Sequence, residues 1–420
     1  MTRTLAAAVA TSALVALPAF AVERSDVLET YADIAAAKYA DSRDAARQLQ
    51  TAIHKFIDAP SAEGLDAART AWREARIPYM QTEVYRFGNP MVDEWEGRVN
   101  AWPLDEGLID YVDPTYGGAT DENEYAALNV IANPQFQLSG RTVDASRITP
   151  DLLQDVLQEA DGVEANVATG YHAIEFLLWG QDLNGTDAGA GDRPWTDYAS
   201  GDDCTNGNCD RRADYLRVVT DLLVDDLDEM ARAWGANGAA RADLTADEEA
   251  GMAAILTGMG SLSYGELAGE RMKLGVLLND PEEEHDCFSD NTHESHYYDG
   301  VGMQNAYLAS YTRMDGSVVS GPSPSDLVAA ADPQVDAQLR ERLDASVEAL
   351  DRVRDAANDG MAYDMMLARG NAEGEKLVMD AVDALVAQTR AIERAVAALD
   401  LGAIEVEGSD SLDAPDAVFQ

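Results

Sequence analysis

The sequence predicts an all-α protein made of two helix-bundle lobes, with few or no strands. Two observations carry this prediction: apolar residues recur at helical spacing over long stretches, and strand signals are scarce. The clearest stripe is one face of the last long helix, formed by Val378, Val382, Leu385, Thr389, Ile392, Val396 and Leu399. Only residues 141–149 suggest the edge of a short hairpin, and no repeat of solenoid period is evident.

The same periodicity predicts the individual helices. Pro78 should bend or end the second of them, and Thr149 and Pro150 have the residue types of an N-cap and a first helical position. Thr245 and Glu248 match a capping box ahead of a glycine-rich helical segment. The expected helices cover residues 25–57, 61–80, 149–160, 164–179, 211–234, 252–278 and 378–399.

Composition shifts along the chain suggest its organisation. Residues 1–21 read as a signal peptide, with a charged start, an apolar run and a small-residue cleavage site at residues 19–21. No cysteine follows the expected cut, so we expect an exported, periplasmic protein without a lipoprotein anchor. A glycine- and alanine-rich junction at residues 235–251 separates the two lobes. The predicted units are residues 22–238, 239–402 and a loose acidic tail, 403–420.

The protein is strongly acidic, with 77 Asp and Glu against 30 Lys and Arg and a net charge of −47. Such a charge makes nucleic acid and anionic membrane surfaces poor partners. It is compatible with attraction of cations and equally with a solvated acidic surface suited to a saline habitat. Charge alone therefore identifies no site.

The three cysteines suggest one local cross-link. Cys204 and Cys209 flank a Thr-Asn-Gly-Asn turn, so we expect a disulfide between them in an exported protein. Cys287 is left over, and we expect it to be buried. The C-x-x-C-H pattern of covalently attached haem is absent.

The stretch "GYHAIEFLLWGQD", residues 170–182, places a histidine and a glutamate three residues apart. His172 and Glu175 therefore share one helical face, where an imidazole and a carboxylate can reach one cation. The pair equally fits a satisfied polar contact inside a bundle, and a metal site needs further ligands.

Two other polar clusters could supply those ligands. Residues 81–113 mix carboxylates with tryptophans, which fits either a half-buried polar pocket or an irregular connection whose acids cap backbone donors. Residues 280–300 hold His285, His293 and His296, three of only five histidines, among several acids. This density suggests metal or anion handling, whereas His54 lies on the polar side of the first helix.

Several enzyme signatures are missing. The sequence contains no H-E-x-x-H, so the usual zinc-protease geometry is not indicated. It also contains no G-x-S-x-G and no P-loop.

"GYHAIEFLLWGQD" resembles the G-x-H-x-x-E motif of the imelysin-like family, which includes iron-regulated protein A and imelysin. The likeness continues through "TEVYRFGNPMVDEWEGRVNAWPLDEGLIDYV", "YGELAGERM" and "EHDCFSDNTH", in that order. The resemblance implies an exported, two-lobed helical protein with a polar site and a role in bacterial iron uptake.

The resemblance also nominates site residues. It implies His172 and Glu175 as metal ligands, and we add Glu83 and Asp105 as carboxylates that complete the set. The residues expected to line the same region are Arg86, Trp102, Glu106, His285, Asp290 and His293.

The expected cargo is iron, as Fe²⁺ or Fe³⁺, with zinc or calcium as alternatives. A membrane component of iron transport would be the partner. The alternatives to metal uptake are a metal-dependent peptidase of the imelysin type and a binder of haem or an anionic polymer. Metallopeptidase chemistry needs three protein ligands, an open position and a general base, and the sequence identifies no base.

Overall fold

The computed structural model describes residues 22–120 and 123–419, so the predicted signal peptide lies outside the described residues. Helices dominate, which confirms the predicted fold class. The α-helices are α1 (Arg24–Asp58), α2 (Ala62–Met80), α3 (Pro90–Glu96), α4 (Glu106–Ile109), α5 (Pro150–Leu152), α6 (Gly170–Trp179), α7 (Cys209–Ala233), α8 (Ala239–Thr245), α9 (Glu248–Ser261), α10 (Leu274–Leu278), α11 (Thr292–Leu308), α12 (Pro324–Ala331), α13 (Pro333–Asn358), α14 (Tyr363–Leu367), α15 (Ala372–Ala398) and α16 (Asp410–Asp413).

Short elements connect these helices. The 3₁₀ turns are η1 (Glu83–Tyr85), η3 (Ala160–Gly162), η4 (Trp195–Tyr198), η5 (Gly201–Asp203), η7 (Pro281–Glu283) and η8 (Pro415–Phe419), and η2 (Leu153–Leu157) and η6 (Leu262–Lys273) are π-helical. Two antiparallel hairpins pair β1 (Gln135–Leu138) with β2 (Arg141–Asp144) and β3 (Ser310–Thr312) with β4 (Val318–Ser320).

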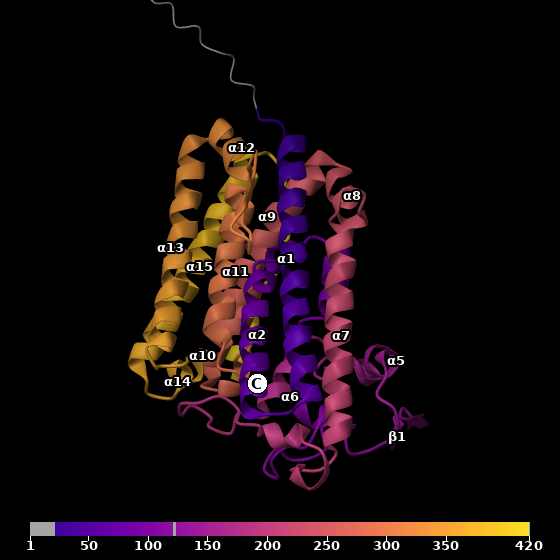
Figure 1. Ribbon diagram of the computed structural model, residues 1–420. Coiled ribbons are helices and arrows are strands. Elements are labelled where there is room, and N and C mark those ends of the chain that lie inside the picture. The colour runs from indigo at the N-terminus through magenta and orange to yellow at the C-terminus, as the bar shows by residue number, and fades with distance from the viewer. Residues whose placement is uncertain (1–21, 121–122, 420) are drawn as a thin grey trace, which may run out of the picture.

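The long helices form two groups that stand side by side (Figure 1). In one group, α1 packs against α2 and α7, and α6 packs against α7. In the other, α15 packs against α13 and η6, and α13 packs against α11. Contacts of α2 with α11 and of α1 with α9 join the groups, and one continuous apolar core extends through both. The domain boundary near residue 238 stays a prediction.

Most predicted helices match the structure closely, and the differences have local causes. The motif helix begins at Gly170 rather than at residue 164, because Gly170 has φ +82°, outside the helical region. The cap of α9 is Asp247, whose side chain accepts from the N–H of Ala250, rather than Thr245. Pro78 lies in the last turn of α2 and does not end it.

The predicted glycine-rich helix is divided into α9, η6 and α10, and its glycines mark close approaches of backbone. A Cβ on Gly258 would lie 2.3 Å from the carbonyl oxygen of Val84, and one on Gly265 would lie 2.7 Å from that of Glu407. The second contact corrects the prediction of a loose tail. Residues 407–411 pack on η6, where the Ser411 hydroxyl donates to the carbonyl oxygen of Gly269 at 2.9 Å.

Cys204 and Cys209 form a disulfide, while Cys287 is a free and partly buried thiol. Within the described parts of the chain, none of the helices combines the length and the apolar character that a bilayer span requires.

A buried lysine stands where the two helix groups meet. Lys38 of α1 is fully buried, and its Nζ donates to the carbonyl oxygens of Gln81 at 2.9 Å and Gly302 at 3.3 Å. Burial disfavours the charged form and lowers the pKa of Lys38 to about 7. A neutral amine keeps two N–H donors, so both hydrogen bonds survive deprotonation.

Lys38→Met should therefore change how stability depends on pH. Between the folded pKa near 7 and the unfolded value near 10.5, the unfolded chain binds one proton more, so Lys38 makes the free energy of unfolding rise with pH. The rise is at most about 1.4 kcal/mol per pH unit. In urea unfolding at pH 7, 8 and 9, the free energy of unfolding of the wild type should increase relative to that of Lys38→Met as the pH rises. The control is Lys376→Met, because Lys376 is an exposed residue of α15. If the difference in the free energy of unfolding between wild type and Lys38→Met did not depend on pH, Lys38 would titrate normally.

Candidate metal centre

The glycine of the motif is required by a close contact at the start of α6. A Cβ on Gly170 would lie 2.5 Å from the carbonyl oxygen of Val99, and the N–H of Tyr171 donates to that oxygen at 2.8 Å. This contact fixes where α6 begins. It therefore places His172 in the first turn, facing the second half of the chain.

His172 is held by Glu175. Its Nδ1 lies 3.0 Å from Oε2 of Glu175, and Oε1 of Glu175 accepts from the N–H of Ser289 at 3.0 Å and its hydroxyl at 2.6 Å. Burial and the nearby Asp286 raise the pKa of Glu175, while the Ser289 hydrogen bonds oppose the rise. Both carboxylate oxygens are thus engaged, and Glu175 is placed to orient the imidazole.

The other nitrogen of His172 has no such contact. Nε2 is buried without a hydrogen-bond partner among the described residues. Burial, together with the charge of Arg76, lowers the pKa of His172 to about 3, so the ring is neutral at pH 7. With the shared proton on Nδ1, Nε2 offers a lone pair to a ligand.

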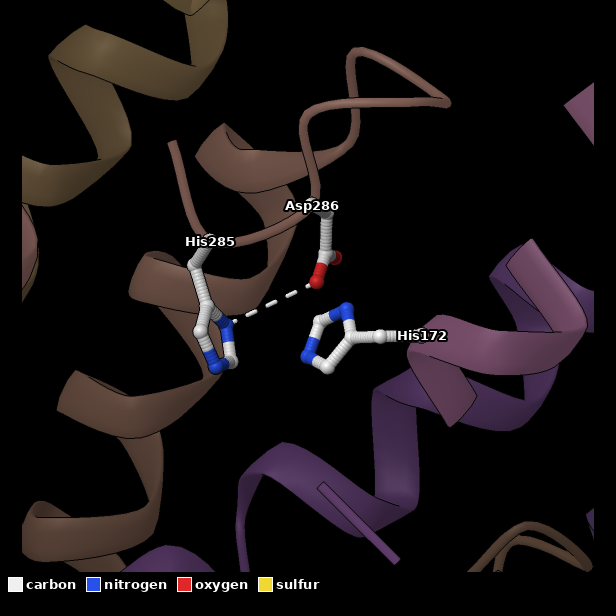
Figure 2. A group of neighbouring side chains, drawn as sticks. All are labelled: His172, His285 and Asp286. Atoms are coloured by element: carbon white, nitrogen blue, oxygen red, sulfur yellow. Dashed lines mark ion pairs between the residues drawn. The ribbon is translucent and has the colours of Figure 1, made fainter. Parts of the chain in front are cut away.

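Three buried side chains face one another at this point (Figure 2). His172, His285 and Asp286 each offer one ligand atom, and these atoms lie within 4.8 Å of one another. The two imidazole rings are 4.8 Å apart between centroids, and Nδ1 of His285 lies 3.5 Å from Asp286 Oδ1. Two imidazoles and one carboxylate with open positions are the donor set of non-haem Fe(II) sites.

Arg76 of α2 positions the carboxylate of this group. It donates from Nη2 to Asp286 Oδ1 at 2.7 Å and from Nε to Oδ2 at 3.4 Å, and from Nη1 to Asn100 Oδ1 at 2.5 Å. Burial would raise the pKa of Asp286, but the Arg76 charge and hydrogen bonds from Ser295 and Asn291 lower it to about 2. Asp286 is therefore ionised at neutral pH.

Glu83, predicted as a ligand, lies outside the group. Its Oε2 accepts from Nη2 of Arg271 at 2.8 Å, and Arg271 also binds Glu266 at 2.7 Å and Asp299 at 3.3 Å. Arg86, predicted to line the site, pairs with Asp93 at 2.8 Å and lies 3.5 Å from Glu266. This network neutralises much of the charge beside the centre.

Asp105, the other added ligand, lies in a neighbouring cavity of about 350 Å³ that Glu106, Trp102 and Cys287 also line. Asp105 accepts from the Tyr116 hydroxyl at 3.0 Å and from the Asn123 amide. Trp102 connects this cavity to the centre, because its ring lies 5.9 Å from that of His285.

Asp290 and His293 line a different cavity, of about 660 Å³, between α2, the loop before α11, and α13. The structure thus brings His285 together with His172 and leaves Asp290 and His293 to one side. It also places Asp286 and Arg76 at the centre, which the sequence patterns above do not predict. Asp286 directly follows His285, and Arg76 falls on the same helical face as Trp72 and Tyr79, which was the signal available in the sequence.

A cleft of about 670 Å³ leads from the surface to His285. Its inner end, where the lining residues are most buried, includes His285, Asn100 and Arg271, none of them more than 2% exposed. Its walls carry Asp93, Glu94, Glu96, Glu159, Glu164, Glu266 and Glu270, with Arg86 and Arg271.

Comparison with known proteins identifies the family. The family model described as imelysin, Peptidase_M75, matches residues 35–392, which is most of the chain. The chain belongs to the imelysin family. Among individual relatives, iron-regulated protein A of Synechococcus elongatus is 42% identical over 64 residues, 15% of this chain and 18% of that protein. The chain therefore matches only a small part of that relative's length.

Solved structures of imelysin-family proteins share the fold. A protein described as an iron-regulated protein A precursor from Parabacteroides distasonis superposes with a TM-score of 0.64 at 17% identity, over 91% of this chain and 97% of that one. An imelysin-like protein from Psychrobacter arcticum gives 0.56 at 16% identity, over 92% and 99%. At these identities the likeness concerns the fold alone.

Proposed function

We propose that this imelysin-family protein binds an iron-class transition-metal ion through His172, His285 and Asp286, and serves bacterial iron uptake as an exported, periplasmic protein. The observation that supports binding most directly is the buried group of His172, His285 and Asp286, in which Nε2 of His172 has no hydrogen-bond partner among the described residues. The names of the relatives support the link to iron.

The donor set favours Fe²⁺ over calcium. Calcium prefers six to eight oxygen ligands, whereas two of the three donors here are imidazole nitrogens. Zinc accepts the same donors and remains the strongest competitor. A partner in the membrane that delivers or receives the ion is part of the proposal.

The geometry favours binding over the other two functions considered. Peptide hydrolysis needs a free general base at the metal, whereas both carboxylate oxygens of Glu175 already contact His172 and Ser289. An anionic polymer or the propionates of haem would meet the acidic walls of the cleft.

Titration of the apo-protein with Fe²⁺ under anaerobic conditions, and with Co²⁺ and Zn²⁺, tests this proposal. We expect one ion per chain, and at least about 100-fold weaker binding in His172→Ala and His285→Ala with the helical circular dichroism unchanged. Glu175→Gln should weaken binding by about 10–100-fold, as loss of an orienting group does. His54→Ala, whose Nε2 pairs with Asp221 on the surface, is the control. Equal affinity of His172→Ala and wild type would refute the site.

A further inference from the structure

The cleft that reaches His285 carries a strong excess of negative charge. Seven carboxylates line it against two arginines. Its outer part is formed by exposed glutamates such as Glu94, Glu159 and Glu164, for which no ion pair is formed with the described residues. Deeper in, Glu96 is buried, and burial together with Glu83 and Glu266, opposed by Arg86, raises its pKa to about 7. The negative charge of the cleft therefore lies mainly in its outer part, where Glu94, Glu159 and Glu164 are exposed.

The inner end also presents an unused hydrogen-bond donor. Asn100 is only 2% exposed, and its Oδ1 accepts from Arg76, the same guanidinium that holds Asp286. Its Nδ2 is buried without a partner among the described residues. Because buried donors in proteins are normally hydrogen-bonded, we expect an oxygen acceptor next to the Asn100 Nδ2 group when the site is occupied.

The carboxylates of the cleft and the free Asn100 amide together restrict which ligands can reach His285. A cleft lined by one sign of charge between low-dielectric walls concentrates ions of the opposite sign and speeds their association by about 10- to 1000-fold. A cavity of about 670 Å³ is large enough for a small chelate, so the selection rests on charge rather than on size. Chelates with several carboxylates are repelled, and hydrated cations are attracted.

We propose that the cleft admits the metal as a free, hydrated divalent ion and rejects anionic carboxylate chelates, and that the Asn100 amide donates to a water molecule that the bound ion retains. This inference rests on the proposed metal-binding function and specifies its substrate. Three protein ligands leave open coordination positions, and a retained water supplies the oxygen that Nδ2 lacks.

Stopped-flow association of Co²⁺ with the full chain tests the route. In Glu94→Gln/Glu159→Gln/Glu164→Gln we expect the association rate constant to fall about tenfold at low ionic strength and the dissociation rate constant to change little. The wild-type rate should fall as salt rises, because screening shortens the range of the field. The matched control replaces three exposed glutamates of α13 and α15 outside the cleft, Glu341, Glu348 and Glu393, by glutamine.

The outcomes separate this inference from the function on which it rests. If wild type binds Co²⁺ tightly but the cleft variant associates as fast as the control, or if cobalt citrate loads as fast as aqueous Co²⁺, the inference is overturned and the metal site stands. If wild type binds no Co²⁺ at all, the proposed function fails instead.

The retained water is tested separately with Mn²⁺. Water-proton relaxation of the Mn²⁺-loaded protein should show at least one exchanging water on the ion. At saturating Mn²⁺, the relaxation enhancement per bound ion should change in Asn100→Leu, and an unchanged enhancement would contradict the role of Asn100. A wild-type complex without exchangeable water would contradict the role of Asn100.

Discussion

Arg76→Met will lower the free energy of unfolding by about 3–5 kcal/mol, because it leaves the buried carboxylate of Asp286 without its counter-ion. Arg76 and Asp286 are each no more than 1% exposed at their side chains, and their closest contact is 2.7 Å. Guanidinium chloride unfolding at pH 7 measures the loss.

Two further variants show whether the unpaired charge is the cause. In the double variant Arg76→Met/Asp286→Asn, we expect part of the stability to return, since a neutral amide needs no counter-ion. Arg232→Met, which breaks the exposed pair with Asp228, should cost no more than about 1 kcal/mol. A double variant as unstable as Arg76→Met would indicate lost packing rather than lost charge.

Gly170→Ala has the second large expected effect, a loss of about 2–5 kcal/mol. The positive φ of +82° strains any residue with a Cβ by roughly 1–2 kcal/mol, and the new methyl group would overlap the backbone of Val99, which adds about 1–3 kcal/mol. Thermal and denaturant unfolding of the variant measure the sum.

Gly162→Ala separates the two causes. Gly162 has a similar φ of +74°, but a Cβ there would meet nothing within 4 Å. We expect Gly162→Ala to cost only the conformational strain. Equal losses in the two variants would mean that Val99 yields to the methyl group and that the contact does not fix the start of α6.

Periodicity predicted α1, α2, α7 and α15, because each of these helices buries one continuous apolar stripe, but it did not indicate α11 or α13. It placed the first helix at 25–57, and α1 spans Arg24–Asp58. It could not place the start of α6, since this start depends on the close approach of Gly170 to the carbonyl group of Val99, 71 residues earlier in the chain. The π-helical η6 was likewise invisible, because its hydrogen-bonding pattern leaves no distinct hydrophobic period.

The centre was predictable only in part, for a similar reason. Helical spacing placed His172 beside Glu175, and histidine density drew attention to His285. Residues 284–291 form a loop without a regular period, so the sequence does not show which of their side chains face inward. Asp286 could therefore not be predicted as part of the site. Glu83 was nominated as a ligand, but Arg271, 188 residues away, accounts for its charge in the structure. Long-range ion pairs of this kind leave no local signal.

Ser289 and Glu175, which meet beside the centre, are 114 residues apart in the chain. The three donors likewise come from two distant segments, α6 and the loop before α11. An ion held between them is a reversible cross-link, so its binding free energy adds to the cohesion of the fold, by about 2.7 kcal/mol when the free ion is at 100 times its Kd. In the proposed function, binding of the ion would therefore raise the stability of the fold, and its release would lower it.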